Sequence, residues 1–173
     1  MRALAFWRAV TVDHANFLER LLGVLNAHRI RYCVIGGQAV NAYVEPVVSL
    51  DLDIAIALDQ MEEAKAAMGE AFAIEAFPHS LNVSTEGSDL RAQIQTDPRY
   101  GGFVDRAVPR TVLGVELPVA RLEDVLQGKI WAVQDPARRG SKRQKDLADI
   151  ARLLETYPDL RSRVPADILA RLM

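Results

Sequence analysis

The sequence has one cysteine, few aromatic residues and no excess of positive charge. Phe, Trp and Tyr make up 6% of its 173 residues, and 21 Lys and Arg stand against 23 Asp and Glu, a formal net charge of −2. A single cysteine excludes an internal disulfide and fits a reducing compartment. The charge balance argues against a globally basic nucleic-acid-binding protein, so a nucleic-acid partner would need a local patch.

The sequence also lacks a long apolar run that could cross a bilayer, and no membrane partner is expected. The first ten residues are apolar, but they include Arg2 and Arg8 and no small-residue cleavage site follows, which argues against a secretory signal. Cys33 lies in an apolar run and is expected to pack as a small hydrophobic residue. These absences predict a cytoplasmic protein.

What is present is an ordinary globular composition, 50% hydrophobic and 25% charged, in a length that suits one domain over 1–173. The patterns predict an α/β (α+β) fold: a mixed sheet flanked by helices, with a helical C-terminal third over about 121–173. Strands are expected over 30–35, 49–58, 73–77, 80–85 and 90–97, with a hairpin over 111–119 around Gly114. Helices are expected over 11–29, 38–44, 60–72, 103–107, 121–134, 143–156 and 164–173, the first capped by Thr11 or Asp13 and the third by Asp59.

Two aspartates one residue apart mark the clearest strand, 49–58. Side chains two apart on a strand share a face, so Asp51 and Asp53 project together. Paired carboxylates repel each other unless a cation lies between them, and Mg²⁺ prefers oxygen ligands of this kind. A solvated strand face is the alternative, but the small Ala55 and Ala57 on the same face favour a surface that is covered or closely approached.

A Gly-Gly turn follows the preceding strand, Tyr32 to Ile35. Gly36 and Gly37 would let backbone amides approach a phosphate without a Cβ in the way. Alone, such a pair would be read as a tight turn. Together with the two aspartates, it predicts a site for a metal-bound nucleotide.

The C-terminal part adds a basic segment with two open interpretations. Five cations lie close together around a Gly-Ser turn and would either contact phosphates or form a mobile surface loop; they are Arg138, Arg139, Lys142, Arg143 and Lys145. The charged helix face formed by Lys145, Asp146 and Asp149 needs no function by itself. Stacking of a base on Tyr43, Tyr100 or Trp131 is less expected than packing.

These residues resemble the nucleotidyltransferase-fold superfamily (DNA polymerase beta-like), and especially its minimal bacterial members such as the AbiE-type toxins. The shared motif is Ile35-Gly36-Gly37, thirteen residues, then Asp51-Leu52-Asp53-Ile54. A second match pairs the helix lysine Lys129 with the element Lys145-Asp-Leu-Ala-Asp149.

The resemblance implies the chemistry of metal-dependent transfer of a nucleoside monophosphate from an NTP to an RNA (tRNA) or protein acceptor. Asp51 and Asp53 would bind Mg²⁺ or Mn²⁺ and act in catalysis. Gly36, Gly37, Gln38 and Ser49 would contact the phosphates. Lys129, Lys145 and Asp146 would assist at the rim.

The sequence departs from the family pattern at two positions. Gln93 stands where a third carboxylate is usual, and Asp89 or Asp97 could replace that carboxylate only in a shifted register. Val47 stands where many relatives have an arginine. Loss of the third carboxylate keeps an alternative open, a catalytically degenerate protein that binds a nucleotide or a protein partner. A role as one half of a toxin–antitoxin pair, with a cognate antitoxin or toxin as partner, is the third hypothesis.

Overall fold

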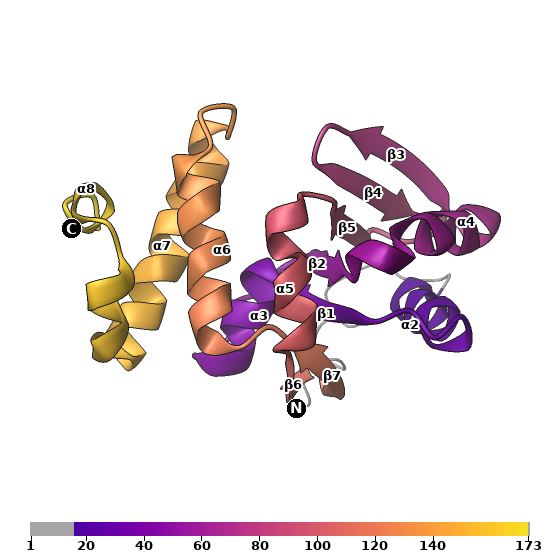
Figure 1. The fold of residues 1–173 in the computed structure, drawn as a ribbon, viewed down its shortest axis with the longest axis horizontal. Coiled ribbons are helices and arrows are strands. Elements are labelled where there is room, and N and C mark those ends of the chain that lie inside the picture. Colours follow the sequence, from indigo (N-terminus) through magenta and orange to yellow (C-terminus); the bar gives the residue numbers. More distant parts are fainter. Residues whose placement is uncertain (1–15, 173) are drawn as a thin grey trace.

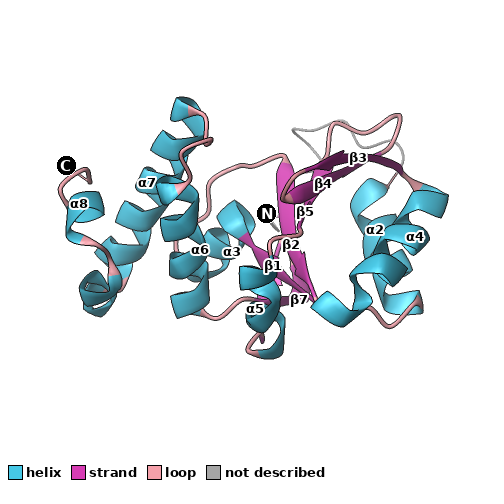
Figure 2. Ribbon diagram, turned by 45° about the horizontal axis from the view of Figure 1, so that its top comes forward, coloured by secondary structure: helices cyan, strands magenta, loops and turns pink. Residues whose placement is uncertain are grey.

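The computed structural model describes residues 16–172, in which one mixed sheet is covered by helices on both faces. Figure 2 shows helices α2 (Phe17–Ala27) and α4 (Met61–Ala71) on one face. Helices α3 (Gly36–Tyr43), α5 (Gly101–Asp105) and α6 (Leu122–Gln134) cover the other face. The last helices extend away from the sheet beyond α6 (Figure 1). The predicted α/β fold with a helical C-terminal third is confirmed.

The sheet has seven strands in the order β3-β4-β5-β2-β1-β7-β6. Strand β2 pairs antiparallel with β1 and parallel with β5, and β1 pairs parallel with β7. The two hairpins, β3-β4 and β6-β7, lie at the opposite edges of the sheet. The strand bounds are β1 Tyr32–Ile35, β2 Asp51–Ile56, β3 Ala73–Phe77, β4 Ser80–Ser84, β5 Arg91–Gln95, β6 Val108–Val112 and β7 Val115–Val119.

The predicted hairpin is present, and its turn explains the choice of glycine. Leu113 has φ 54° and Gly114 has φ 81°, so the two central residues of the turn are both left-handed. That geometry matches the right-handed twist of the flanking strands and favours glycine. Strand β6 begins at Val108, three residues before the predicted start.

The remaining helices are α7 (Gly140–Thr156), α8 (Ala166–Leu169) and the 3-10 helices η1 (Leu58–Gln60), η2 (Pro98–Tyr100) and η3 (Pro158–Arg163). Helix α7 begins three residues earlier than predicted, inside the basic segment. The predicted final helix is shorter than expected, and η3 precedes it. No described helix combines the length and apolar composition that crossing a bilayer requires.

Two predicted helix caps have different outcomes. Thr11 and Asp13 lie outside the described residues. The cap by Asp59 is wrong: α4 begins after Gln60 without a side-chain cap, and η1 occupies the position expected for the cap. The Asp59 carboxylate instead accepts a hydrogen bond from Arg31 at 2.7 Å, because the end of β2 brings these two residues together.

The core lies on both faces of the central strands. Leu52, Ile54 and Ile56 of β2 are buried on one face, and Ala55 is buried on the other. The apolar stripe of α2 packs on one side of this sheet with α4, and on the other side the apolar stripes of α6 and α7 pack against each other. The small, covered face of β2 is therefore confirmed, and its aspartates lie at one end of a rigid strand.

Cys33 in the centre of β1 is fully buried, and burial together with the charge of Asp124 raises the pKa of its thiol to about 12. At pH 8 the folded chain should therefore react with a disulfide reagent such as DTNB about a thousandfold more slowly than the unfolded chain, because only the thiolate attacks. The measurement is the rate of thiol release with and without urea. Fast release from the folded protein would contradict the buried position.

Candidate active site

The candidate site lies where β1, β2 and β5 run side by side. In the sheet register, Asp53 lies opposite Ile35 of β1 and Gln93 of β5. Asp51 and Asp53 are both partly buried, while Leu52 and Ile54 between and beyond them are buried on the other face. The two carboxylates therefore share a face of β2, as the sequence predicts.

Gly36 allows the Gly-Gly turn and the carboxylate of Asp53 to lie against each other. Gly36 has φ 68°, and a Cβ built at this position would overlap Oδ2 of Asp53. Helix α3 begins at this residue without a side-chain cap, so its first amides have no side-chain acceptor at the cap position. A Cβ at Gly37 would meet nothing within 4 Å, so this residue borders open space. Such a helix start attracts anionic groups.

The charge of Asp53 is unfavourable in the described structure. The pKa of its carboxyl is raised to about 6: burial is the largest cause and Asp51 adds to it, while Lys129, Arg138 and Lys142 act in the opposite direction. Asp51 forms an ion pair with Arg91, with 3.4 Å between Oδ1 of Asp51 and Nε of Arg91. A buried carboxylate beside a second carboxylate is stabilised when a cation binds between them.

The other predicted phosphate-binding residues, Gln38 and Ser49, lie together between α3 and the segment before β2. Nε2 of buried Gln38 donates to the backbone oxygen of Ser49 at 3.3 Å. Ser49 lines the cleft next to Asp51. The structure therefore places Ser49 at the cleft, while Gln38 supports the backbone that leads into it.

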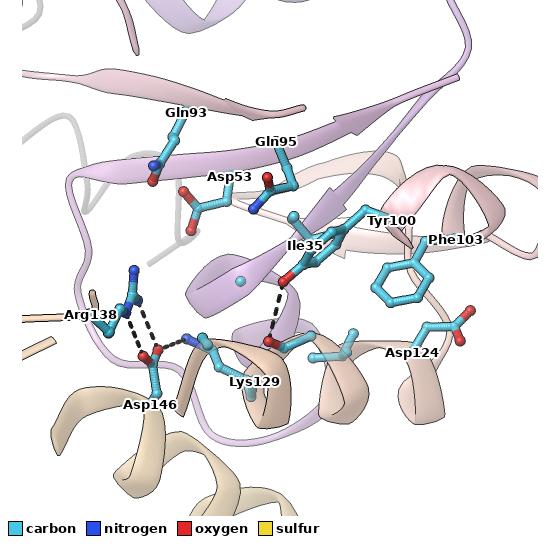
Figure 3. A pocket seen from close by; sticks show the side chains of 14 residues that line it. Ile35, Asp53, Gln93, Gln95, Tyr100, Phe103, Asp124, Lys129, Arg138 and Asp146 are labelled. Carbon is cyan, nitrogen blue, oxygen red and sulfur yellow. Dashed lines mark hydrogen bonds and ion pairs between the residues drawn. The ribbon is translucent and has the colours of Figure 1, made fainter. Parts of the chain in front are cut away.

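A buried ion-pair network forms the opposite wall of the cleft, and Figure 3 shows its side chains facing Asp53. Nζ of Lys129 on α6 lies 3.0 Å from Asp146 and 2.9 Å from Asp149, both on α7. Arg138 also binds Asp146, with Nε at 2.8 Å. Burial lowers the pKa of Lys129, but Asp149 and Asp146 outweigh that effect, so its pKa is raised. Lys129 remains a cation.

This network revises the predicted role of Asp146. Its side chain is buried and is held by Lys129 and Arg138, so it does not lie at the rim. Lys129, also predicted at the rim, is likewise buried, between Asp146 and Asp149. Lys145 is exposed and lines the cleft, which fits a rim position. The residues of the basic segment also differ in position. Arg143 donates hydrogen bonds to the backbone oxygens of Asp135 and Arg138. Arg139 and Lys142 instead line cavities.

The walls enclose a cleft of about 330 Å³ between the sheet and α7. Beneath it, an inner cavity of about 90 Å³ extends along α6. Asp53, Gln93, Lys129, Arg138 and Asp146 line both. Tyr100 packs edge-on against Trp131, with ring centroids 5.1 Å apart. Tyr43 lies under Arg110, so the expected packing role of the candidate aromatics is confirmed.

Gln93 occupies the position beside Asp53 where a third carboxylate is expected. Asp97 does not replace it, since it follows β5 and binds Arg99 at 2.8 Å. Asp89 lies before β5, two residues ahead of Arg91, which is the residue opposite Asp51. Among residues 16–172, no cluster of three acidic, histidine or cysteine side chains is placed to hold a metal ion.

The side chains of Asp51, Asp53 and Gln93 nevertheless fit a divalent cation. Two carboxylates and the amide oxygen of Gln93 are hard oxygen donors on adjacent strands, which suit Mg²⁺ or Mn²⁺ better than a soft metal. The raised pKa of Asp53 favours the same interpretation, because a cation would relieve the cost of its charge.

Two further residues, Asn41 and Arg152, belong to this site but were missed by sequence reasoning. Asn41 on α3 exchanges hydrogen bonds with the backbone of Val47, and Arg152 on α7 reaches the same loop. A polar residue on a short helix and an arginine on a charged helix face carry no signal in periodicity or motif. Their role follows from tertiary structure.

The two glycines provide a matched test of the turn. Gly36→Ala should lower the free energy of unfolding by at least about 2 kcal/mol, because it forces an alanine into a left-handed conformation and against Asp53. Gly37→Ala should change it by less than about 1 kcal/mol, since its Cβ meets open space within a helix. Urea unfolding measures both. Equal effects would show that the close approach does not constrain the fold.

Comparison with solved structures shows the same fold. The antibiotic-resistance factor ANT(2")-Ia, solved in complex with adenylyl-2"-tobramycin, aligns with a TM-score of 0.60 at 13% identity, over 91% of this chain and 98% of that one. The lincosamide antibiotic adenylyltransferase LnuA aligns with a TM-score of 0.54 at 13% identity, over 82% and 99%. An antigenic nucleotidyltransferase-like protein from Paracoccidioides brasiliensis gives 0.54 at 16% identity, over 94% and 89%.

No curated protein matches the chain in sequence. One family model does match, the one described as nucleotidyl transferase AbiEii toxin of the type IV toxin–antitoxin systems, and it covers residues 17–172. The match includes the Gly-Gly turn, both aspartates and the lysine–aspartate network. The chain therefore belongs to the AbiEii family of nucleotidyltransferase toxins.

Proposed function

We propose that this chain transfers a nucleoside monophosphate from an NTP to a hydroxyl group of an RNA or protein acceptor, with Mg²⁺ or Mn²⁺ bound by Asp51 and Asp53. The observation that supports this most is the uncapped start of α3 against Asp53. A site for phosphates and a site for a cation touch each other there, and only a glycine at position 36 permits it. Membership of the AbiEii family supports the same activity.

The residues of the cleft have different proposed roles according to their position. Gly36 and Gly37 bind phosphate oxygens through backbone amides. Lys129, Lys142 and Lys145 add positive charge along the cleft. Asp51 and Asp53 would hold the divalent cation, which when bound would supply charge neutralisation for the triphosphate and for the pyrophosphate leaving group. The acceptor oxygen forms a bond to the α-phosphorus, the bond from that phosphorus to pyrophosphate breaks, and the hydroxyl proton passes to solvent, because Gln93 has no basic atom.

The presence of Gln93 in place of a third carboxylate favours a second function, nucleotide binding without transfer. With two carboxylates in place of three, the site has one negative charge fewer to hold a cation, and a carboxylate base is missing beside Asp53. A protein of this kind would bind nucleotide without transferring it. In either case, the toxin–antitoxin family favours a cognate antitoxin as a protein partner, and a cytoplasmic location is proposed on the same basis.

The direct test incubates the purified chain with each α-labelled NTP and Mg²⁺ or Mn²⁺, with and without total cellular RNA. Label should enter RNA or protein, and Asp51→Asn together with Asp53→Asn should reduce transfer at least about a hundredfold, the scale of losing one preorganised charge-stabilising group.

Glu75→Gln is the matched control, because it removes an exposed strand carboxylate that does not line the described cleft. Absence of transfer with metal-dependent NTP binding, lost in the double variant, would establish the binding function. Absence of both signals would reject both nucleotide functions.

The missing carboxylate can be restored. Gln93→Glu should tighten Mn²⁺ binding by about tenfold, since it adds a charged ligand opposite Asp53. Gln144→Glu is the control, because it adds the same charge at an exposed position of α7 that lines neither the cleft nor the cavity beside it. Titration calorimetry measures both affinities. Equal gains in the two variants would mean that position 93 does not face the cation.

A further inference from the structure

The loop between α3 and β2, residues 44–50, supplies most of the apolar surface of the cleft. Most of the residues that line the cleft are charged or polar; the large apolar ones are Val47 and Val48, with Ala148 beside them. Val47 and Val48 are 56% and 59% exposed. Neighbouring exposed valines at the edge of a polar ligand cleft are typical of a surface that packs against an apolar part of a ligand.

This loop has no regular structure of its own, and side chains hold its backbone. Asn41 acts as a strand partner would: Nδ2 donates to the oxygen of Val47 at 2.7 Å, and Oδ1 accepts from the nitrogen of Val47 at 3.0 Å. Gln38 donates to the oxygen of Ser49. Two residues of α3 therefore fix the loop relative to the Gly-Gly turn at the start of the same helix.

Arg152 ties the loop to the opposite wall. Its Nη2 donates to the backbone oxygen of Glu45 at 2.6 Å and to Oδ1 of Asn41 at 3.0 Å. Its Nη1 donates to Asp149 at 2.7 Å, and Asp149 also binds Lys129. The position of the two valines is therefore set relative to Lys129 by a continuous series of charged contacts. The planar guanidinium of arginine can donate all three of these hydrogen bonds at once. The ammonium of a lysine lacks this planar geometry.

We infer that Val47 and Val48 of loop 44–50 form the surface on which the nucleoside part of the NTP packs, and that Asn41 and Arg152 are positioning residues that hold these valines there. The inference rests on the proposed function, which places the triphosphate at Gly36, Gly37 and Lys129. The valines line the same cleft as those groups and offer no charge. They suit a ribose and base, while the phosphates contact the other residues.

The test compares two probes, an NTP and inorganic tripolyphosphate, by titration calorimetry in Mg²⁺. All four NTPs are tested, and the tightest is used. Val48→Ala should weaken NTP binding about three- to tenfold, because two methyl groups leave an apolar contact. Its affinity for tripolyphosphate should stay unchanged. Val108→Ala is the matched control, since Val108 is 37% exposed on β6 and does not line the cleft.

The positioning residues are tested in the same assay. Asn41→Ala removes both hydrogen bonds to Val47 and should weaken NTP binding about tenfold, again with little change for tripolyphosphate. Arg152→Gln should act in the same direction, and Arg152→Lys should restore part of the loss, because it keeps the charge toward Asp149. In a transferase assay, KM should rise more than kcat falls.

Each outcome separates the inference from the proposed function. Equal loss of NTP and tripolyphosphate affinity in Val48→Ala and Asn41→Ala would overturn the inference, since the loop would then act on the phosphates or on the whole fold. Unchanged NTP affinity in all variants would also overturn it. A wild-type chain that binds NTP without transferring it would reject the transferase activity while the binding comparison still decides the role of the loop. A wild-type chain that binds no NTP would reject both.

Discussion

The interaction on which the site depends is the burial of Lys129 between two aspartates of α7. An ammonium removed from water is costly unless its charge is matched, and Asp146 and Asp149 match it at 3.0 and 2.9 Å. Arg138 donates to both carboxylate oxygens of Asp146, and Arg152 binds the oxygen of Asp149 that Lys129 does not contact. Because each of these charges is paired with the next, the network favours one alignment of α6 and α7. Lys142 and Lys145 of α7, which line the cleft beside it, give this wall its positive charge.

The sheet presents an equally fixed acidic wall. Asp53 lies on the middle one of three paired strands. The carboxylate of Asp53 lies so close to Gly36, at the start of α3, that a Cβ at position 36 would overlap it. The cleft is thus formed by two rigid surfaces of opposite charge. This separation of charge would attract an anionic group toward the lysines of α7 and a cation toward Asp53.

Sequence reasoning found the parts of this site that have a local signature. The period-two pattern of β2 identifies Asp51 and Asp53, and the apolar strand before Gly36 identifies the turn. It failed where a role depends on a distant partner. Asp146 looks like a surface residue in a charged helix, and only the tertiary fold places it against Lys129 and Arg138. Asp59 fits the pattern of a cap, but the nearby guanidinium of Arg31 competes for it.

Those distant contacts have a consequence for how the site comes into being. The described side chains of the cleft come from positions as far apart as Gly37 and Arg152, and they meet through strand pairing and helix packing rather than through local turns. Contacts of long sequence separation form late in folding, because the chain must first close large loops. A chain still being synthesised therefore has no complete cleft until α7 has emerged and docked.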